Sequence, residues 1–152
     1  MDRLRPVELT EIAARGASMI IESSAMDGLA ADIVITLFSA DPPIHDDGEL
    51  EALLHVPLST IRPSIQRALR ESPGLTLHRL VQWARHLRAI ELAARGMHML
   101  EIAFTLRVDE RTLQRQAVRL TGRTFRTCVE MGPHVAIELL RAQLRAPPRT
   151  GT

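Results

Sequence analysis

A set of polar side chains between Glu110 and Leu120 has the residue types and the spacing needed to contact a nucleic acid. Arg and Gln side chains hydrogen-bond base edges in pairs, while Thr and further Arg side chains suit phosphate groups. At helical spacing the set falls on one face, opposite the apolar residues of the same stretch. The expected contact residues are Arg111, Thr112, Gln114, Arg115 and Arg119. A solvated, arginine-rich helix is the alternative that this stretch alone leaves open.

Two predicted helices position this set. The segment Met99–Leu106 has apolar residues at helical spacing, and Asp109 has the side chain of a good N-cap for the helix that follows. In that second helix, Leu113, Ala117 and Leu120 are expected to face the core. Two short helices separated by three residues are typical of a helix-turn-helix unit.

An approximate repeat predicts a second unit of this kind earlier in the chain. Residues 65–69 have Ile, Arg and Leu at alternate positions with a Gly five residues later, and residues 113–117 have Leu, Arg and Ala in the same arrangement. The two copies start 48 residues apart, and such a repeat indicates a repeated structural unit. The contact residues expected in the first copy are Arg62, Ser64, Gln66, Arg67 and Arg70. We expect one unit to read bases while the other mainly holds phosphate.

Residues 74–92 lie largely in a long predicted helix that carries Arg85, Ala89 and Leu92. Three further motifs follow it, at residues 99–103, 111–115 and 121–126. Over Leu75–Glu130 the chain thereby resembles the DNA-binding domain of the AraC-type (AraC/XylS) transcriptional regulators. The resemblance implies a mainly α fold with two helix-turn-helix units joined by a long helix. It also implies binding to promoter DNA and contact with RNA polymerase.

The chain departs from the family pattern at several positions. Arg107 stands in the turn that usually carries Gly, and a non-glycine residue there needs a positive φ or a rearranged turn, at a cost of about 1 kcal/mol. The large aromatic residue expected at Ala117 is absent, so other side chains must fill the core there. In the first unit Pro57 and Pro63 bracket the turn, and Ile61 occupies the expected cap position. Pro63 is tolerable only in a first helical turn.

Charge is distributed unevenly along the chain. Residues 1–51 have 3 Arg and 11 acidic residues, whereas residues 52–152 have 16 Arg and 7 acidic residues, which gives net charges of −8 and +9. A basic block of this kind favours a polyanionic partner such as double-stranded DNA. A solvated basic surface is the alternative interpretation.

The N-terminal part predicts a different architecture. Val7–Arg15 has a helical apolar pattern, and Gly16 follows as an expected C-cap. Residues 17–23 read as a short buried strand, and Gly28–Ser39 as a second helix. Residues 41–48 combine paired prolines with Asp and Gly, which favour a linker.

We therefore expect three parts: an acidic α/β segment (helix–strand–helix) over residues 1–45, an AraC-like DNA-binding domain over 46–131, and a C-terminal helix with a disordered tail over 132–152. The first part resembles the last βα unit of a receiver-like domain and is too short for a full ligand-binding domain. Three interpretations stay open for it. It forms a homodimer, it completes its sheet with a partner chain, or it is what remains of a longer regulator.

Several other classes of function have little support in the sequence. The single cysteine, Cys128, excludes a disulfide framework, and the six His residues show no ligand spacing, so we expect no metal and no cofactor. No apolar run reaches the length of a membrane span, the N-terminus does not read as a secretory signal, and no nucleophile–base motif indicates an enzyme. We expect a cytoplasmic, bacterial, sequence-specific transcription regulator. The alternative is a helical protein-interaction module, or a regulator remnant that does not bind DNA.

Overall fold

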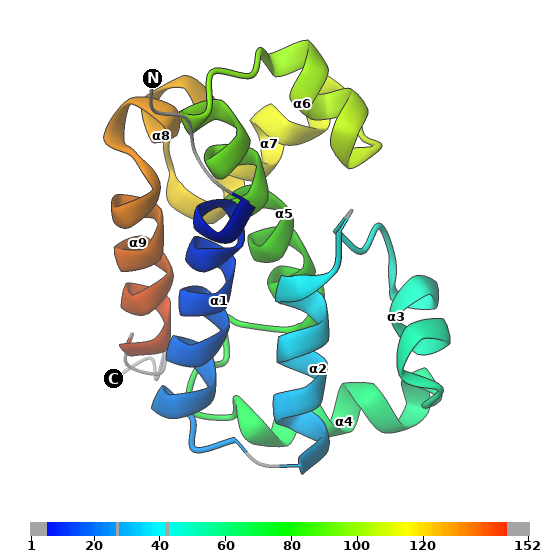
Figure 1. Cartoon of the computed structure of the whole chain (residues 1–152). Helices are drawn as coiled ribbons and strands as arrows, with labels where there is room; N and C mark the ends of the chain where they lie inside the picture. Colours follow the sequence, from blue (N-terminus) through cyan, green and yellow to red (C-terminus); the bar gives the residue numbers. More distant parts are fainter. Residues whose placement is uncertain (1–5, 27, 42, 146–152) are drawn as a thin grey trace.

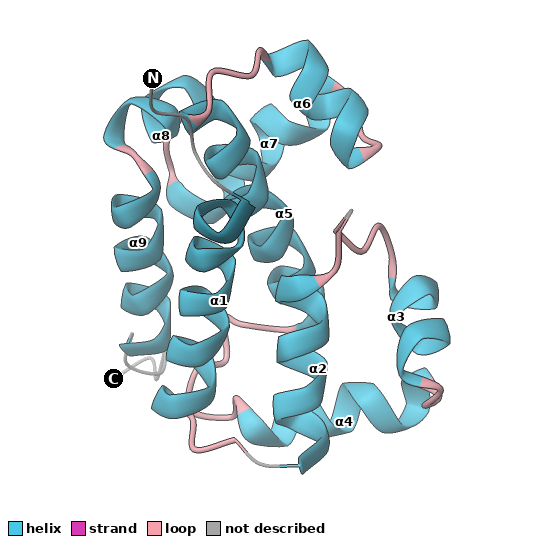
Figure 2. Ribbon diagram, in the orientation of Figure 1, coloured by secondary structure: helices cyan, strands magenta, loops and turns pink. Residues whose placement is uncertain are grey.

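The computed structural model describes residues 6–145 except residues 27 and 42, and this part of the chain contains helices and no strand (Figures 1 and 2). The mainly α fold predicted from the sequence is therefore confirmed. The disordered tail predicted after residue 145 lies outside the described residues. In chain order the helices are α1 Pro6–Ser23, α2 Gly28–Ser39, α3 Asp47–Leu54, α4 Leu58–Ala68, α5 Leu77–Ala94, α6 Met99–Leu106, α7 Glu110–Thr121, α8 Phe125–Met131 and α9 Pro133–Arg145.

The strand predicted over residues 17–23 is wrong, because α1 continues through Gly16 to Ser23. Gly16 is not a C-cap but a point of close approach between helices. A Cβ atom added there would lie 3.0 Å from Leu87 Cδ1 of α5, 3.5 Å from Phe38 Cε2 of α2 and 3.6 Å from Ile137 Cδ1 of α9. The apolar run after Gly16 is therefore buried as helix. Without the strand, the resemblance to a receiver-like unit has no structural basis.

The apolar side chains form two clusters that meet along α5. The first cluster contains residues from α1, α2, α3, α4, α9 and most of α5, among them the fully buried Trp83. The second cluster is built by the last turns of α5 with α6, α7 and α8. Because the first cluster includes α1 and α2, the N-terminal segment packs on the helices that follow the linker rather than lying apart from them.

Helix α5 is the central element. Every residue from Leu80 to Leu92 is buried, so α5 is covered on all sides rather than along one stripe. Its 18 residues correspond to a length of about 27 Å. Figure 1 shows α3 and α4 at one end of the molecule and α6, α7 and α8 at the other, with α1, α2 and α9 running alongside α5. The long helix thus separates two short helix pairs, α3–α4 and α6–α7.

The two helix pairs repeat with an offset of 52 residues rather than the 48 that the motif predicts. Helices α3 and α6 have eight residues each and start at positions 47 and 99. Each ends at a residue in the left-handed conformation, His55 with φ 57° and Arg107 with φ 62°. Each following helix then starts after three connecting residues. The four-residue difference arises because the motif starts at the eighth residue of α4 but at the fourth residue of α7.

This offset corrects the start of α4. The helix begins at Leu58, four residues before the predicted Arg62, and its N-cap is Pro57 rather than Ile61. Pro57 provides no side-chain hydrogen bond to the helix. Pro63 is the sixth residue of α4, beyond the first turn, where its missing N–H leaves the Ser59 carbonyl without an i+4 donor. Ser59 is exposed, so water can satisfy that carbonyl.

Candidate nucleic-acid interface

Helix α7 is fixed at both ends and along its inner face. The Asp109 carboxylate accepts a 2.7 Å hydrogen bond from the backbone N–H of Thr112, which confirms the predicted N-cap. Hydrogen bonds from Thr112 lower the pKa of Asp109, so the cap stays ionised and suits the positive end of the helix dipole. Gly122 ends the helix with φ 76°. Leu113, Ala117 and Leu120 are buried, as the sequence predicts.

The outer face of α7 brings together the polar residues that the sequence predicts as contacts. Arg111, Gln114, Arg115 and Arg119 are exposed, and Thr112 is half-buried at the first turn. Within the described part of the chain, none of the three arginines has a carboxylate within ion-pair distance. Their guanidinium groups are therefore available to an anionic partner.

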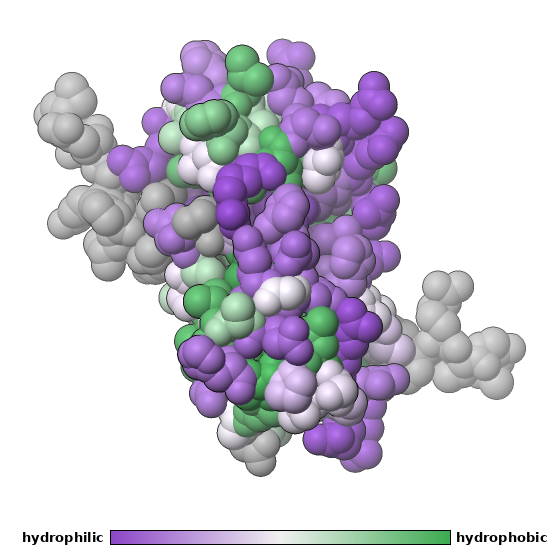
Figure 3. All heavy atoms as spheres, turned by 90° about the vertical axis from the view of Figure 1, so that its right-hand side faces the viewer, coloured by the Kyte–Doolittle hydropathy of each residue, from purple (hydrophilic) through white to green (hydrophobic). Residues whose placement is uncertain are grey.

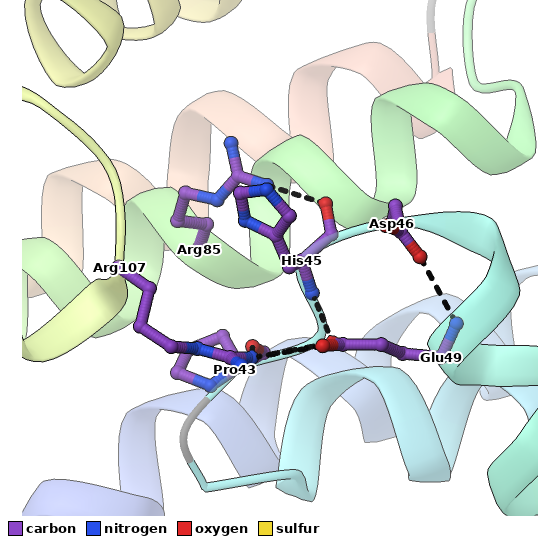
Figure 4. Close-up of polar contacts among 6 residues, drawn as sticks. All are labelled: Pro43, His45, Asp46, Glu49, Arg85 and Arg107. Carbon is purple, nitrogen blue, oxygen red and sulfur yellow. Dashed lines mark hydrogen bonds and ion pairs between the residues drawn. The ribbon is translucent and has the colours of Figure 1, made fainter.

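The turn before α7 contains the strained residue that the sequence predicts. Arg107 adopts φ 62° and ψ 37°, the conformation for which glycine is the usual residue. Its side chain leaves the turn and reaches the other helix pair (Figure 4). The guanidinium Nη2 donates to both carboxylate oxygens of Glu49 on α3, at 3.2 and 3.3 Å, and lies 3.5 Å from the Pro43 carbonyl oxygen.

A second arginine holds the same linker from α5. Arg85 is buried, and burial lowers its pKa because water no longer solvates the charge. Its guanidinium donates to the His45 carbonyl oxygen at 3.1 Å and to Gln116 Oε1 of α7 at 3.2 Å. The linker residue His45 also donates its backbone N–H to Glu49 Oε1 at 2.7 Å. One polar network thus joins the linker with α3, α5 and α7, and Figure 4 shows its part around the linker.

The first helix pair presents its predicted contact residues only in part. Gln66, Arg67 and Arg70 are exposed, although Arg70 follows the end of α4. Arg62 is exposed but forms an ion pair with Asp47 of α3, with Nη2 2.7 Å from Oδ2. Ser64 is buried, so it does not belong to the exposed face, and the prediction for this residue is wrong.

The 52-residue offset shows which residues of the first pair the sequence analysis missed. Ser59 and Thr60 occupy in α4 the places that Arg111 and Thr112 occupy in α7, and both are exposed. The buried Ser64 corresponds to Gln116, which is also buried. These residues are found when the two pairs are aligned by the equal lengths of α3 and α6. Alignment by the motif of residues 65–69 instead shifts α4 by four residues relative to α7.

Helix α6 of the second pair has an exposed apolar surface. Leu100 and Phe104, one helical turn apart, are 69% and 86% exposed. A groove of about 850 Å³ lies between α6, α7 and α8, with Ile102, Val118 and Phe125 among its lining residues. Figure 3 shows the side of the molecule on the right of Figure 1, where hydrophilic residues cover most of the surface and hydrophobic patches lie toward both ends.

Three buried ionisable residues of α5 lie away from these exposed faces. His86 is fully buried between the rings of Trp83 and Phe125, with centroid distances of 5.6 and 6.5 Å, and burial lowers its pKa to about 4. Burial raises the pKa of Glu91 to about 7, although nearby Arg88 opposes this shift. The Arg88 Nε atom lies 3.4 Å from Glu91 Oε1. These residues mark the region where the two apolar clusters meet.

Comparisons with protein-family models, curated proteins and solved structures give no match to this chain. No helix within the described residues has the length and apolar character needed to cross a membrane. The same part of the chain brings no three His, Cys, Asp or Glu side chains together in a way that could hold a metal ion.

Proposed function

We propose that the chain is a DNA-binding transcription regulator whose two helix pairs act as helix-turn-helix units. The observation that carries this proposal is the outer face of α7. Three arginines and a glutamine share an exposed face of a helix that is capped at both ends and preceded by a three-residue turn. Arg and Gln are the side chains best suited to paired hydrogen bonds with base edges in the major groove.

The arrangement of the second pair supports this role for α7 rather than for α6. Of the inner residues of α7, Leu113 and Ala117 belong to the second apolar cluster and Leu120 to the first, so the helix presents its polar face outward from a fixed position. In contrast, the outer side chains of α6 include Leu100 and Phe104, which have no hydrogen-bonding groups for DNA. In the proposed complex α7 enters the major groove, and Arg side chains outside the groove contact phosphates.

The first pair supports a weaker contact of a different kind. Its exposed face has hydroxyl groups at the start of α4 and basic or amide groups further along, namely Ser59, Thr60, Arg62, Gln66 and Arg67. The ion pair with Asp47 occupies part of the Arg62 charge. Hydroxyl and amide groups suit phosphate and sugar contacts, so α4 is assigned mainly to positioning and α7 to base reading.

The test is binding to a random-sequence DNA duplex of about 30 base pairs, at about 50 and about 200 mM salt. Wild type is compared with Arg111→Ala/Arg115→Ala and with Arg15→Ala/Arg141→Ala, which removes two arginines from α1 and α9. We expect wild-type affinity to fall at least about tenfold with added salt. The α7 variant should bind more weakly, and its log affinity should depend less steeply on log salt because two positive charges are removed from the interface, while the control keeps both properties.

A wild type that circular dichroism shows to be folded, yet that does not bind the duplex at the lower salt, would overturn the proposal. The second candidate would then be a helical protein-interaction module. The exposed apolar pair Leu100 and Phe104 on α6 favours that candidate. Binding of a protein partner through such a surface would depend little on salt, in contrast to binding of DNA.

The remaining parts of the proposal follow from the resemblance to AraC-type regulators. Such a regulator would act in the cytoplasm, bind without catalysing a reaction, and contact RNA polymerase at a promoter. A homodimer through residues 1–45 also stays a proposal. The packing of α1 and α2 into the first cluster limits which of their side chains a second chain could reach, and sedimentation measurements of the full chain would test it.

A further inference from the structure

We infer that Arg107 is a positioning residue that fixes the orientation of the second helix pair relative to the first. Its side chain comes from the turn between α6 and α7, and its partner Glu49 belongs to α3 of the first pair. The orientation of the two pairs is a property of the free protein. Only the effect of this orientation on DNA binding rests on the proposed function.

The first argument is the backbone of Arg107. Glycine is the preferred residue at φ 62°, because a residue with a side chain is strained in this conformation. The local turn therefore gains nothing from an arginine. The side chain instead extends to a separate part of the molecule, where Nη2 contacts both Glu49 carboxylate oxygens and approaches the Pro43 carbonyl. We therefore assign the role of Arg107 to its contact with Glu49.

The second argument is that the acceptor is itself held in place. Glu49 lies in the first turn of α3 and accepts the backbone N–H of His45 at 2.7 Å. Arg85, from the buried α5, binds the carbonyl oxygen of the same His45. The Arg107 guanidinium thus reaches a carboxylate that two other hydrogen bonds connect to the central helix, as Figure 4 shows.

The third argument is a comparison within the chain. His55 occupies the equivalent turn of the first pair and has nearly the same backbone conformation, with φ 57°. No hydrogen bond from the described residues reaches the His55 side chain. The left-handed conformation therefore does not require a bridge between the pairs. The bridge is a feature of the Arg107 side chain.

An exposed ion pair contributes little stability by itself, so the expected effect is on orientation. The test measures backbone amide residual dipolar couplings in the full chain, fitted separately for α3–α4 and for α6–α8. In wild type one alignment tensor should fit both parts. Arg107→Gly keeps the turn, since glycine suits φ 62°, and removes the bridge. We expect its two parts to require tensors of different magnitude or direction.

Two further variants make this test specific. Glu49→Gln removes the charge of the acceptor and keeps its shape, so it should change the couplings in the same direction, and the double variant should differ little from Arg107→Gly alone. His55→Gly is the matched control, because it relieves the same backbone conformation without a bridge, and it should behave as wild type. Identical tensors for both parts in Arg107→Gly would overturn the inference.

Binding to duplexes of about 12 and about 30 base pairs then connects orientation with function, because only the longer duplex accommodates both pairs. Arg107→Gly should bind the longer duplex about fivefold more weakly than wild type and the shorter one equally well, a shift that a small change in conformational populations produces. Equal weakening on both duplexes would mean that Arg107 contacts DNA directly and would overturn the positioning role. Absence of DNA binding by every variant would overturn the proposed function, whereas the dipolar couplings would still decide the orientation.

Discussion

His86 and Glu91, five residues apart on the buried helix α5, respond to pH in opposite ways. The folded-state pKa of His86 is about 4, below its ordinary value of 6.5, so its contribution to stability is present above pH 6.5 and is lost as the pH falls toward 4. The folded-state pKa of Glu91 is about 7, above its ordinary value of 4.5. Its contribution is therefore present below pH 4.5 and is lost as the pH rises toward 7. Between these limits the two effects oppose each other.

Glu91→Gln removes the titration of Glu91 and leaves that of His86 unchanged. As the pH falls from 7 to 4.5, the unfolding free energy of wild type should therefore rise by about 2 to 3 kcal/mol relative to that of this variant. Urea unfolding across this pH range measures the difference. Glu71→Gln, at an exposed site, is the control and should follow wild type. A constant difference between Glu91→Gln and wild type would show that Glu91 does not titrate in this range.

Arg107 illustrates what residue types can and cannot predict at this scale. The sequence predicts a positive φ or a rearranged turn at this position, because the resemblance places a glycine there, and the structure has the positive φ. It does not predict the contact with Glu49, which lies 58 positions earlier and has no recognisable spacing relative to Arg107. Ser64 shows the same limit, since its burial depends on the register of α4 rather than on its polarity.

At the scale of single elements, the helices with clear end signals are predicted best. The bounds of α6 agree with the sequence prediction, and α7 differs by one residue, because Asp109 and Gly122 mark the ends of α7. The sequence misplaces the start of α4, because Pro57 caps it without a side-chain hydrogen bond. The end of α1 is misplaced for a different reason, since Gly16 serves packing between helices and a sequence gives no sign of which neighbour approaches a glycine.

A substitution at Gly16 tests that role of α1. Gly16→Leu should lower the unfolding free energy by about 1 kcal/mol, because overpacking of a filled core costs about 2 kcal/mol, which exceeds the helix-propensity gain of about 1 kcal/mol. The clash arises first with Leu87 Cδ1. Ala14→Leu, on an exposed position of the same helix, is the control and should change stability little. A Gly16→Leu variant as stable as wild type in urea would contradict the close packing of α1.

At the scale of the whole molecule, one continuous helix belongs to both apolar clusters. Trp83 lies in the first cluster and Leu113 in the second, and the His86 ring lies between Trp83 and Phe125, nearly perpendicular to both rings. Because α5 cannot unfold at one end without exposing residues of the other cluster, we expect both clusters to unfold together. The domain boundary predicted near residue 45 does not separate these two clusters.

Leu113→Ala tests this coupling. The change removes a fully buried side chain from the second cluster and should cost about 2 to 5 kcal/mol. The fluorescence of Trp83, the single tryptophan of the chain, reports on the first cluster, while circular dichroism reports on all helices. Both denaturation midpoints should shift together by the same amount. A tryptophan transition that keeps its wild-type midpoint would show two independently unfolding parts.

The unequal helix pairs also give the molecule a direction. Helix α7 has arginine at the place where α4 has Ser59, and α4 contains a proline within its second turn, so no two-fold axis relates the two exposed faces. A DNA site that matches one copy of this chain would be asymmetric in sequence. A palindromic site would match only one of the two helix pairs well. Inverting such a target relative to a gene would turn the whole protein around and present a different side to any neighbour on the same DNA. Searches for the target should therefore score both strands separately and impose no symmetry.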